Sequence, residues 1–153
     1  MDHLHRGRSP TGPSTRLGVT MLGARPATCP FCERAAAGAV FAANATAVAL
    51  PDAYPLAAGH TLVCPRRHVS DLFALDEDEW SGVWSLVRDV QRRLVGGVDA
   101  DGWNVGVNAG PAAGQTVEHA HVHLIPRRAG DVVDPRGGVR WVLPDRADYW
   151  SRS

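Results

Sequence analysis

The sequence predicts an α+β domain, in which several short strands accompany one long amphipathic helix. Two apolar runs, Val40 to Leu50 and His60 to Cys64, have the residue types of strands and are bounded by turn residues such as Pro51 and Gly59. Between residues 76 and 94 the apolar side chains recur at helical spacing instead. Two later segments alternate between faces as half-buried strands do, which adds two more strands after the helix.

The helix is the most strongly marked element. Asp76 can cap its first turn, and Glu79 stands three residues later, which is the spacing of a capping box. Gly96 and Gly97 end the helical pattern. The apolar stripe comprises Trp80, Val83, Trp84, Val87, Val90 and Leu94. Because both tryptophans share this stripe with the valines, we expect them to pack in the core rather than bind a ligand.

The last strand carries the main functional signal. Residues 103 to 108 alternate as a strand, and the loop of residues 109 to 114 is rich in glycine, alanine and proline. The chain then enters a second alternating run with His119, His121 and His123 separated by apolar residues. In a strand, alternate side chains share a face, so the three imidazoles are predicted to line one surface. Imidazole can donate, accept or attack near neutral pH, which makes this surface a candidate site.

Length and charge narrow the classes of protein. The 153 residues suit one domain, and 16 basic residues balance 16 acidic ones, which argues against a sequence-independent grip on nucleic acid. No apolar run has the ~20 residues that cross a bilayer. Residues 1–25 are rich in Arg, Pro, Gly and Ser, so we expect a flexible tail there and one domain over 26–153. We expect a cytoplasmic protein with no membrane or nucleic-acid partner.

Two chemical interpretations of the histidine run stay open. Three imidazoles could hold a catalytic metal with one position left for water. Alternatively, the neighbouring Gly114, Gln115 and Thr116, with Asn108 at the other end of the loop, supply neutral donors that suit phosphate oxygens. A metal hydrolase usually has a carboxylate as a ligand or base in the same cluster. None is predicted on the imidazole face, since Glu118 is predicted to point to the opposite face. The residues therefore favour phosphate chemistry.

The cysteines suggest a second site near the start of the domain. Cys29 and Cys32 have the C-x-x-C spacing of a metal or thiol site, and the odd total of three argues against a disulfide framework. Two thiolates need two more ligands for tetrahedral zinc, and the sequence offers His68 and His119. Cys64 lies in an apolar strand, where a buried, unreactive thiol is expected.

These motifs together resemble the histidine triad (HIT) family of nucleotide hydrolases and transferases. The resemblance is carried by Gly114-Gln115-Thr116 followed by His119-x-His121-x-His123-Leu124-Ile125-Pro126-Arg127, by Gly59-His60 through Arg67-His68, and by Cys29-Pro30-Phe31-Cys32. Residues 134 to 141 are similar to bacterial members of the fragile histidine triad branch. The family implies an antiparallel sheet with the long helix packed on it, in a homodimer.

The resemblance also implies roles for the site residues. His121 would attack the α-phosphorus of a nucleotide and hold a nucleotidyl-histidine intermediate that water cleaves, while His123 would donate to a phosphate or leaving-group oxygen. His60 would support the site without reacting. The implied substrate-binding residues are Asp52 for the ribose hydroxyls and Asn108, Gln115 and Thr116 for the phosphates.

By the same resemblance, Cys29, Cys32, His68 and His119 would hold a structural zinc, with no catalytic metal or organic cofactor. The expected substrates are diadenosine polyphosphates or adenosine phosphoramidate, cleaved at phosphoanhydride or phosphoramidate bonds. A diadenosine polyphosphate phosphorylase, a nucleotidyltransferase and a nucleotide-binding signalling module with little catalysis are the alternatives. The transferase branch has glutamine where this chain has His123, which makes it the weaker alternative.

Overall fold

The computed structural model describes residues 29–151, which fold around a single antiparallel sheet. The five strands lie in the order β1-β2-β3-β5-β4, and every neighbouring pair is antiparallel. Their bounds are Ala42–Ala43 for β1, Ala47–Pro51 for β2, Thr61–Pro65 for β3, Gly102–Gly106 for β4 and Val122–Arg127 for β5. This confirms the predicted α+β class. The tail expected over 1–25 lies outside the described residues.

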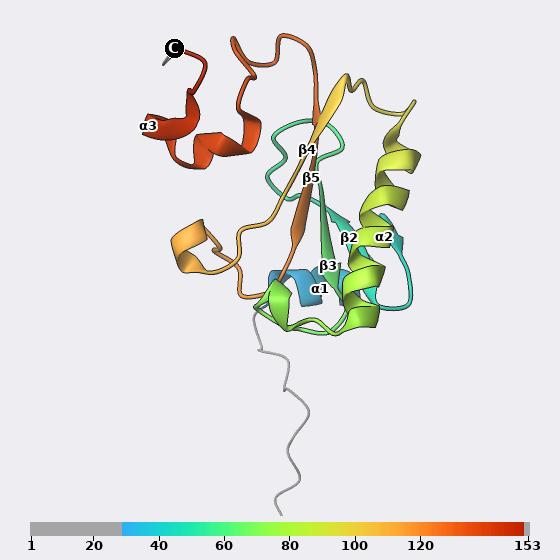
Figure 1. Ribbon diagram of the computed structural model, residues 1–153. Helices are drawn as coiled ribbons and strands as arrows, with labels where there is room; N and C mark the ends of the chain where they lie inside the picture. Colours follow the sequence, from blue (N-terminus) through green and yellow to red (C-terminus); the bar gives the residue numbers. More distant parts are fainter. Residues whose placement is uncertain (1–28, 152–153) are drawn as a thin grey trace, which may run out of the picture.

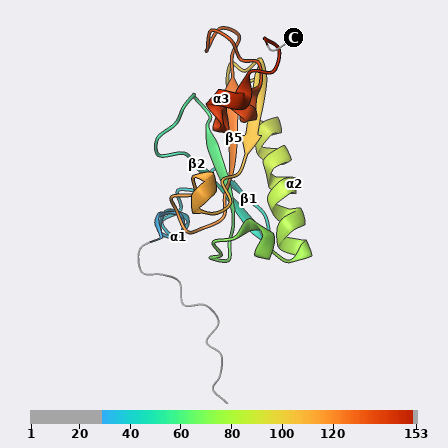
Figure 2. The same cartoon turned by 60° about the vertical axis from the view of Figure 1, so that its left-hand side comes forward.

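The helices divide between the two faces of the sheet (Figures 1 and 2). The long helix α2 covers one face, whereas the short helix α1 and the C-terminal segment lie on the other side. The α-helices are α1, Pro30–Ala36, α2, Glu77–Leu94, and α3, Pro144–Ala147, and the 3-10 turns are η1, Leu72–Ala74, η2, Pro111–Ala113, and η3, Gly138–Val142. Among the described helices, none is long and apolar enough to span a bilayer.

Helix α2 begins as the sequence predicts. The side chain of Asp76 accepts from the backbone N–H of Glu79, and the carboxylate of Glu79 accepts from the N–H of Asp76, which completes the capping box. Val83, Val87, Val90 and Leu94 are buried against the sheet, and Trp84 is partly buried beside them. The core prediction is wrong for Trp80, which is 37% exposed; its ring stacks on Phe73 and is tilted against Trp84.

The run predicted as one strand from Val40 to Leu50 is a hairpin of two strands. Asn44 causes the break, because its side-chain oxygen accepts from the backbone N–H groups of Thr46 and Ala47 and closes a turn. The turn also docks on α2, where the amide of Asn44 donates to the carbonyl of Gly82. A Cβ atom on Gly82 would lie only 1.9 Å from Oγ1 of Thr46, so this contact requires glycine.

The central strands are buried on both faces, which explains their unbroken apolar sequence. In β2, Ala47 and Ala49 join the core cluster under α2, while Val48 and Leu50 join the cluster under α1. The small alanines leave room for the larger side chains of α2. Cys64 is fully buried in the α1 cluster, which confirms the predicted buried thiol, and burial raises the pKa of this thiol to about 12.

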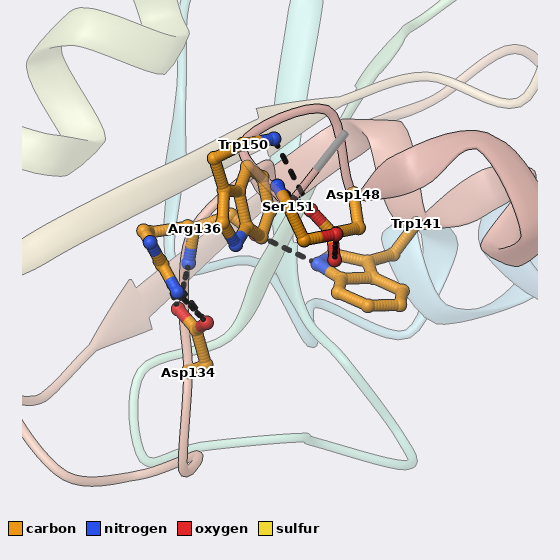
Figure 3. Close-up of polar contacts among 6 residues, drawn as sticks. All are labelled: Asp134, Arg136, Trp141, Asp148, Trp150 and Ser151. Atoms are coloured by element: carbon orange, nitrogen blue, oxygen red, sulfur yellow. Dashed lines mark hydrogen bonds and ion pairs between the residues drawn. The ribbon is translucent and has the colours of Figure 1, made fainter. Parts of the chain in front are cut away.

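The C-terminal segment after β5 packs mainly on itself (Figure 3). Arg136 pairs with Asp134 at 2.7 Å, and its guanidinium lies 4.6 Å from the ring centre of Trp150. The indole N–H of Trp141 donates to the carbonyl of Arg136. Trp141 and Trp150 therefore contact their own segment, which reaches the sheet where η3 meets β4.

Candidate active site and metal cluster

The histidine run does not form one strand face. Strand β5 begins only at Val122, so His119 and His121 lie in the irregular segment before it, and of the three only His123 lies in the sheet. The ring of His119 turns to the cysteines, whereas the rings of His121 and His123 meet edge to face at 5.0 Å. The predicted row of three imidazoles on a strand is wrong, because His119 and His121 each bond to a separate partner.

The imidazole of His121 is held by its own backbone. Its Nδ1 lies 2.7 Å from the carbonyl oxygen of His119, so Nδ1–H donates and the unshared pair remains on Nε2. The edge of Phe31 packs against the ring with the centroids 5.0 Å apart, and the residue is only 7% exposed. One tautomer and one orientation are thus fixed, and Nε2 is the nitrogen left able to accept or attack.

A chain of hydrogen bonds fixes the tautomer of His123. The backbone N–H of Leu56 donates to Nδ1 of His60, which leaves the proton of a neutral His60 on Nε2. That Nε2 lies 3.0 Å from Nδ1 of His123, to which it donates. His123 must then carry its own proton on Nε2 and act as a donor there. His60 is 4% exposed, as a supporting residue should be.

Asp52 borders these two histidines. One carboxylate oxygen accepts from the backbone N–H of Tyr54 and caps a turn, while the other lies 3.4 Å from Nε2 of His60 and 4.0 Å from Nδ1 of His123. Burial, followed by the neighbouring imidazoles of His121 and His60, lowers the pKa of His123 to about 4, although Asp52 opposes the shift. His123 is therefore a neutral donor at neutral pH.

Two cavities meet at these residues. The smaller, of about 330 Å³, is lined by His121, Thr116 and residues of α1, and the larger, of about 770 Å³, extends toward the C-terminal segment. Both are lined by Asp52, Tyr54, Asn108 and His123. A ligand that spans the two cavities would thus pass these four side chains.

Gln115 does not line either of these two cavities, in contrast to Asn108 and Thr116. Its side-chain oxygen accepts from the N–H of Gly110, and its amide nitrogen donates to the carbonyls of Ser70 and Val117. These bonds clasp the loop before the histidines. The amide predicted to bind phosphate is therefore engaged in holding the loop closed.

The four predicted metal ligands come together around His119, two residues before His121. One ligand atom from each of Cys29, Cys32, His68 and His119 lies within 4.8 Å of the others, and the cysteines form no disulfide. Sγ of Cys29 is 3.4 Å from Nδ1 of His119, and Sγ of Cys32 is 3.6 Å from Nδ1 of both histidines. With zinc bonds of about 2.3 Å to sulfur and 2.0–2.1 Å to nitrogen, tetrahedral ligands stand about 3.6 Å apart.

The surroundings of the cluster also fit zinc. Nε2–H of His119 donates to the carbonyl of Pro65 at 2.9 Å, which turns the unprotonated Nδ1 toward the cysteines, as in metal-binding histidines generally. Among the described residues, the three histidines of the run share no ligand cluster, so the alternative of a metal held by all three has no geometric support. Asp52, His60 and His123 also converge, but the two imidazoles share a hydrogen bond of 3.0 Å, and its proton stands where a metal ion would have to bind.

Two site residues were missed from the sequence. Phe31 packs on His121, and Arg34 lines the smaller cavity, both from helix α1. The Cys29-x-x-Cys32 motif was the available signal, because it placed this segment beside His119. Only the folded chain shows that the other face of the same helix reaches the cavity.

The fold agrees with comparisons to known proteins. The HIT domain model matches residues 33–130. The chain is 39% identical to the bifunctional bis(5'-adenosyl)-triphosphatase/adenylylsulfatase of Arabidopsis thaliana over 92 residues, 60% of this chain and 51% of that protein. It is 38% identical to the asymmetrical bis(5'-nucleosyl)-tetraphosphatase of Schizosaccharomyces pombe over 92 residues, 60% of this chain and 50% of that protein.

A solved structure extends the similarity to three dimensions. A zinc-bound histidine triad family protein from Mycobacterium smegmatis superposes with a TM-score of 0.63 at 33% identity, covering 70% of this chain and 80% of that one. By contrast, the chain matches only about half the length of the two curated hydrolases, 51% and 50%. The match to the family model covers most of the described domain. The chain therefore belongs to the histidine triad (HIT) family.

Proposed function

We propose that the protein is a nucleotide hydrolase that cleaves at the α-phosphate of nucleotide conjugates such as diadenosine polyphosphates and adenosine phosphoramidate. The observation that carries the proposal is the fixed ring of His121, which is left with a free Nε2 on the wall of a cavity shared with Asp52 and His123. The names of two relatives, a bis(5'-adenosyl)-triphosphatase and a bis(5'-nucleosyl)-tetraphosphatase, point the same way.

In the first step Nε2 of His121 attacks the α-phosphorus. The nitrogen–phosphorus bond forms as the bond to the leaving group breaks, and a polyphosphate departs with the bonding electron pair as an anion. A phosphoramidate reacts in its N-protonated form, so that ammonia departs with the bonding pair. Nδ1–H remains bonded to the carbonyl of His119, which stabilises the positive charge that develops on the ring. Nε2–H of His123 donates to a phosphate or leaving-group oxygen.

In the second step water attacks the same phosphorus. The nitrogen–phosphorus bond breaks, His121 returns to neutral imidazole, a nucleoside monophosphate is released, and one proton passes to solvent. Asp52 accepts from the ribose hydroxyls, while Asn108 and Thr116 position the phosphates from the cavity wall. We assign Gln115 a different role from the one expected, because its hydrogen bonds hold the loop rather than the substrate.

The direct test is trapping of the intermediate. Wild-type protein mixed rapidly with diadenosine triphosphate and quenched in an alkaline denaturant, in which a nitrogen–phosphorus bond survives, should gain the mass of one AMP on the peptide that contains His121. His121→Ala should give no adduct and no turnover; because the lost ring is buried against Phe31, its melting temperature should fall, and circular dichroism should show that the chain still folds. Full activity of His121→Ala would falsify the nucleophile assignment. Product analysis with and without added phosphate separates hydrolysis of diadenosine triphosphate, which gives AMP and ADP, from phosphorolysis, which gives two ADP and no AMP.

We also propose that Cys29, Cys32, His68 and His119 bind a structural zinc ion. When bound, zinc would tie helix α1 to the segment that carries His121, which lies two residues after His119. Metal analysis of purified wild type should give about one zinc per chain, and Cys29→Ser should lose it. Unaltered zinc content in that variant would rule out this ligand set.

A further inference from the structure

The two cavities can be assigned by the chemistry of the proposed function, on which this inference rests. When the leaving group departs, the nucleoside stays attached through phosphorus to His121, so it must occupy space next to that ring. His121 lines the smaller cavity and is absent from the lining of the larger one. The leaving group departs on the side opposite the attacking nitrogen, beyond His123, toward the larger cavity. The nucleoside therefore belongs in the smaller cavity.

The walls of the smaller cavity suit a nucleoside. Phe31, Leu62 and Val117 offer apolar surface to a planar base, and Asp52 offers a carboxylate to the ribose. The base would then lie between α1 and strand β3. Phe31 and Leu62, which line this space, belong to the same buried cluster as Val48 and Leu50. The polar edge of the base would then contact the side chain at the rim of the smaller cavity.

That side chain is Arg34. Among the described residues that line the smaller cavity, Arg34 is the single permanent cation. Its guanidinium donates from Nη2 to the carbonyl of Pro51, which places the head group directly beside Asp52 in the chain. No carboxylate of the described chain forms an ion pair with it. A guanidinium has five N–H donors, so most of its capacity is available to a ligand.

We propose that Arg34 selects the base and that the site prefers 6-oxopurine nucleotides, those of guanine and hypoxanthine, over adenine nucleotides. The O6 and N7 atoms of a 6-oxopurine are both acceptors and match the fork of a guanidinium. Adenine presents N7 beside the N6 amino group, which is a donor and faces the guanidinium N–H groups unfavourably. A bidentate contact of this kind discriminates between bases by about 5- to 150-fold.

The test uses guanosine, inosine and adenosine 5'-phosphoramidates, because all three share one leaving group. Wild type should hydrolyse the guanosine and inosine compounds with kcat/KM about 5- to 150-fold above the adenosine compound. Arg34→Leu should remove this ratio by lowering the first two selectively, and Arg34→Lys should restore only part of it. Arg88→Leu, the same change on the exposed surface of α2, is the matched control and should keep the wild-type ratio.

Two outcomes would overturn the assignment. Equal kcat/KM for the three bases in wild type would show that Arg34 does not read the base, and an equal loss with all three in Arg34→Leu would place it on the phosphate. If no compound is hydrolysed, the proposed function fails, and calorimetric titration of GMP, IMP and AMP still decides the base preference. Loss of the GMP preference in folded Arg34→Leu supports the proposal, and its persistence, or no binding to wild type, refutes it.

Discussion

Replacing His60 should impair the reaction without touching a reacting atom. In His60→Phe, the donor to Nδ1 of His123 is lost, and this partly buried nitrogen keeps no partner in the same direction. An unsatisfied buried acceptor costs about 1–3 kcal/mol. His123 can recover this energy by moving its proton to Nδ1, but Nε2 then no longer donates to the substrate. We therefore expect kcat to fall by about 5- to 150-fold.

The measurement has two parts. Steady-state kinetics should show the loss in kcat more than in KM, and His60→Gln, whose amide can donate to His123, should recover part of the rate. Nitrogen-15 NMR of the imidazole rings should show His123 protonated on Nε2 in wild type and a mixture of tautomers in His60→Phe. An unchanged kcat in His60→Phe, or a wild-type His123 protonated on Nδ1, would refute the hydrogen-bond chain as the cause.

Other consequences of the structure can be measured separately. Gly82→Ala should lower the urea midpoint because its Cβ would meet Thr46 at 1.9 Å, although helix propensity alone favours alanine by about 1 kcal/mol; in a Thr46→Ala background the same change should become stabilising. Since the pKa of His123 is lowered from 6.5 to about 4, its contribution to stability is complete above pH 6.5 and is lost as pH falls toward 4; His123→Gln should lose stability less steeply over that window. Zinc chelation should lower the melting temperature of wild type and leave that of Cys32→Ser unchanged. Light scattering should give the mass of a dimer, and a monomer at all concentrations would contradict that expectation.

The elements with a local cause were predictable. The capping box of Asp76 and Glu79 and the apolar stripe after it fix α2 by short-range contacts, so the sequence alone located this helix. Asn44 was also visible, but a run of alanines and valines gives no sign of where a strand turns. The turn forms because the side-chain oxygen of Asn44 finds two backbone N–H groups while its amide reaches Gly82 on a distant helix.

The site was predicted as a set of residues and less well as an arrangement. The four candidate metal ligands do converge, because C-x-x-C and two histidines define a recognisable donor set. Strict alternation of three histidines suggested a strand, whereas the carbonyls of Pro65 and His119 compete successfully for the rings of His119 and His121. The use of Gln115 inside the loop also depends on Ser70, which is 45 residues away in sequence.

The segment of helix α1 contributes side chains to both the metal cluster and the smaller cavity. Cys29 and Cys32 face His68 and His119, whereas Phe31 and Arg34, from the same two turns, line the smaller cavity. Each residue of a helix advances by about 100°. Insertion or deletion of one residue between Cys29 and Arg34 would therefore rotate the following side chains out of both places at once. Natural variants should therefore differ in this segment by substitution and not by insertion or deletion of a single residue.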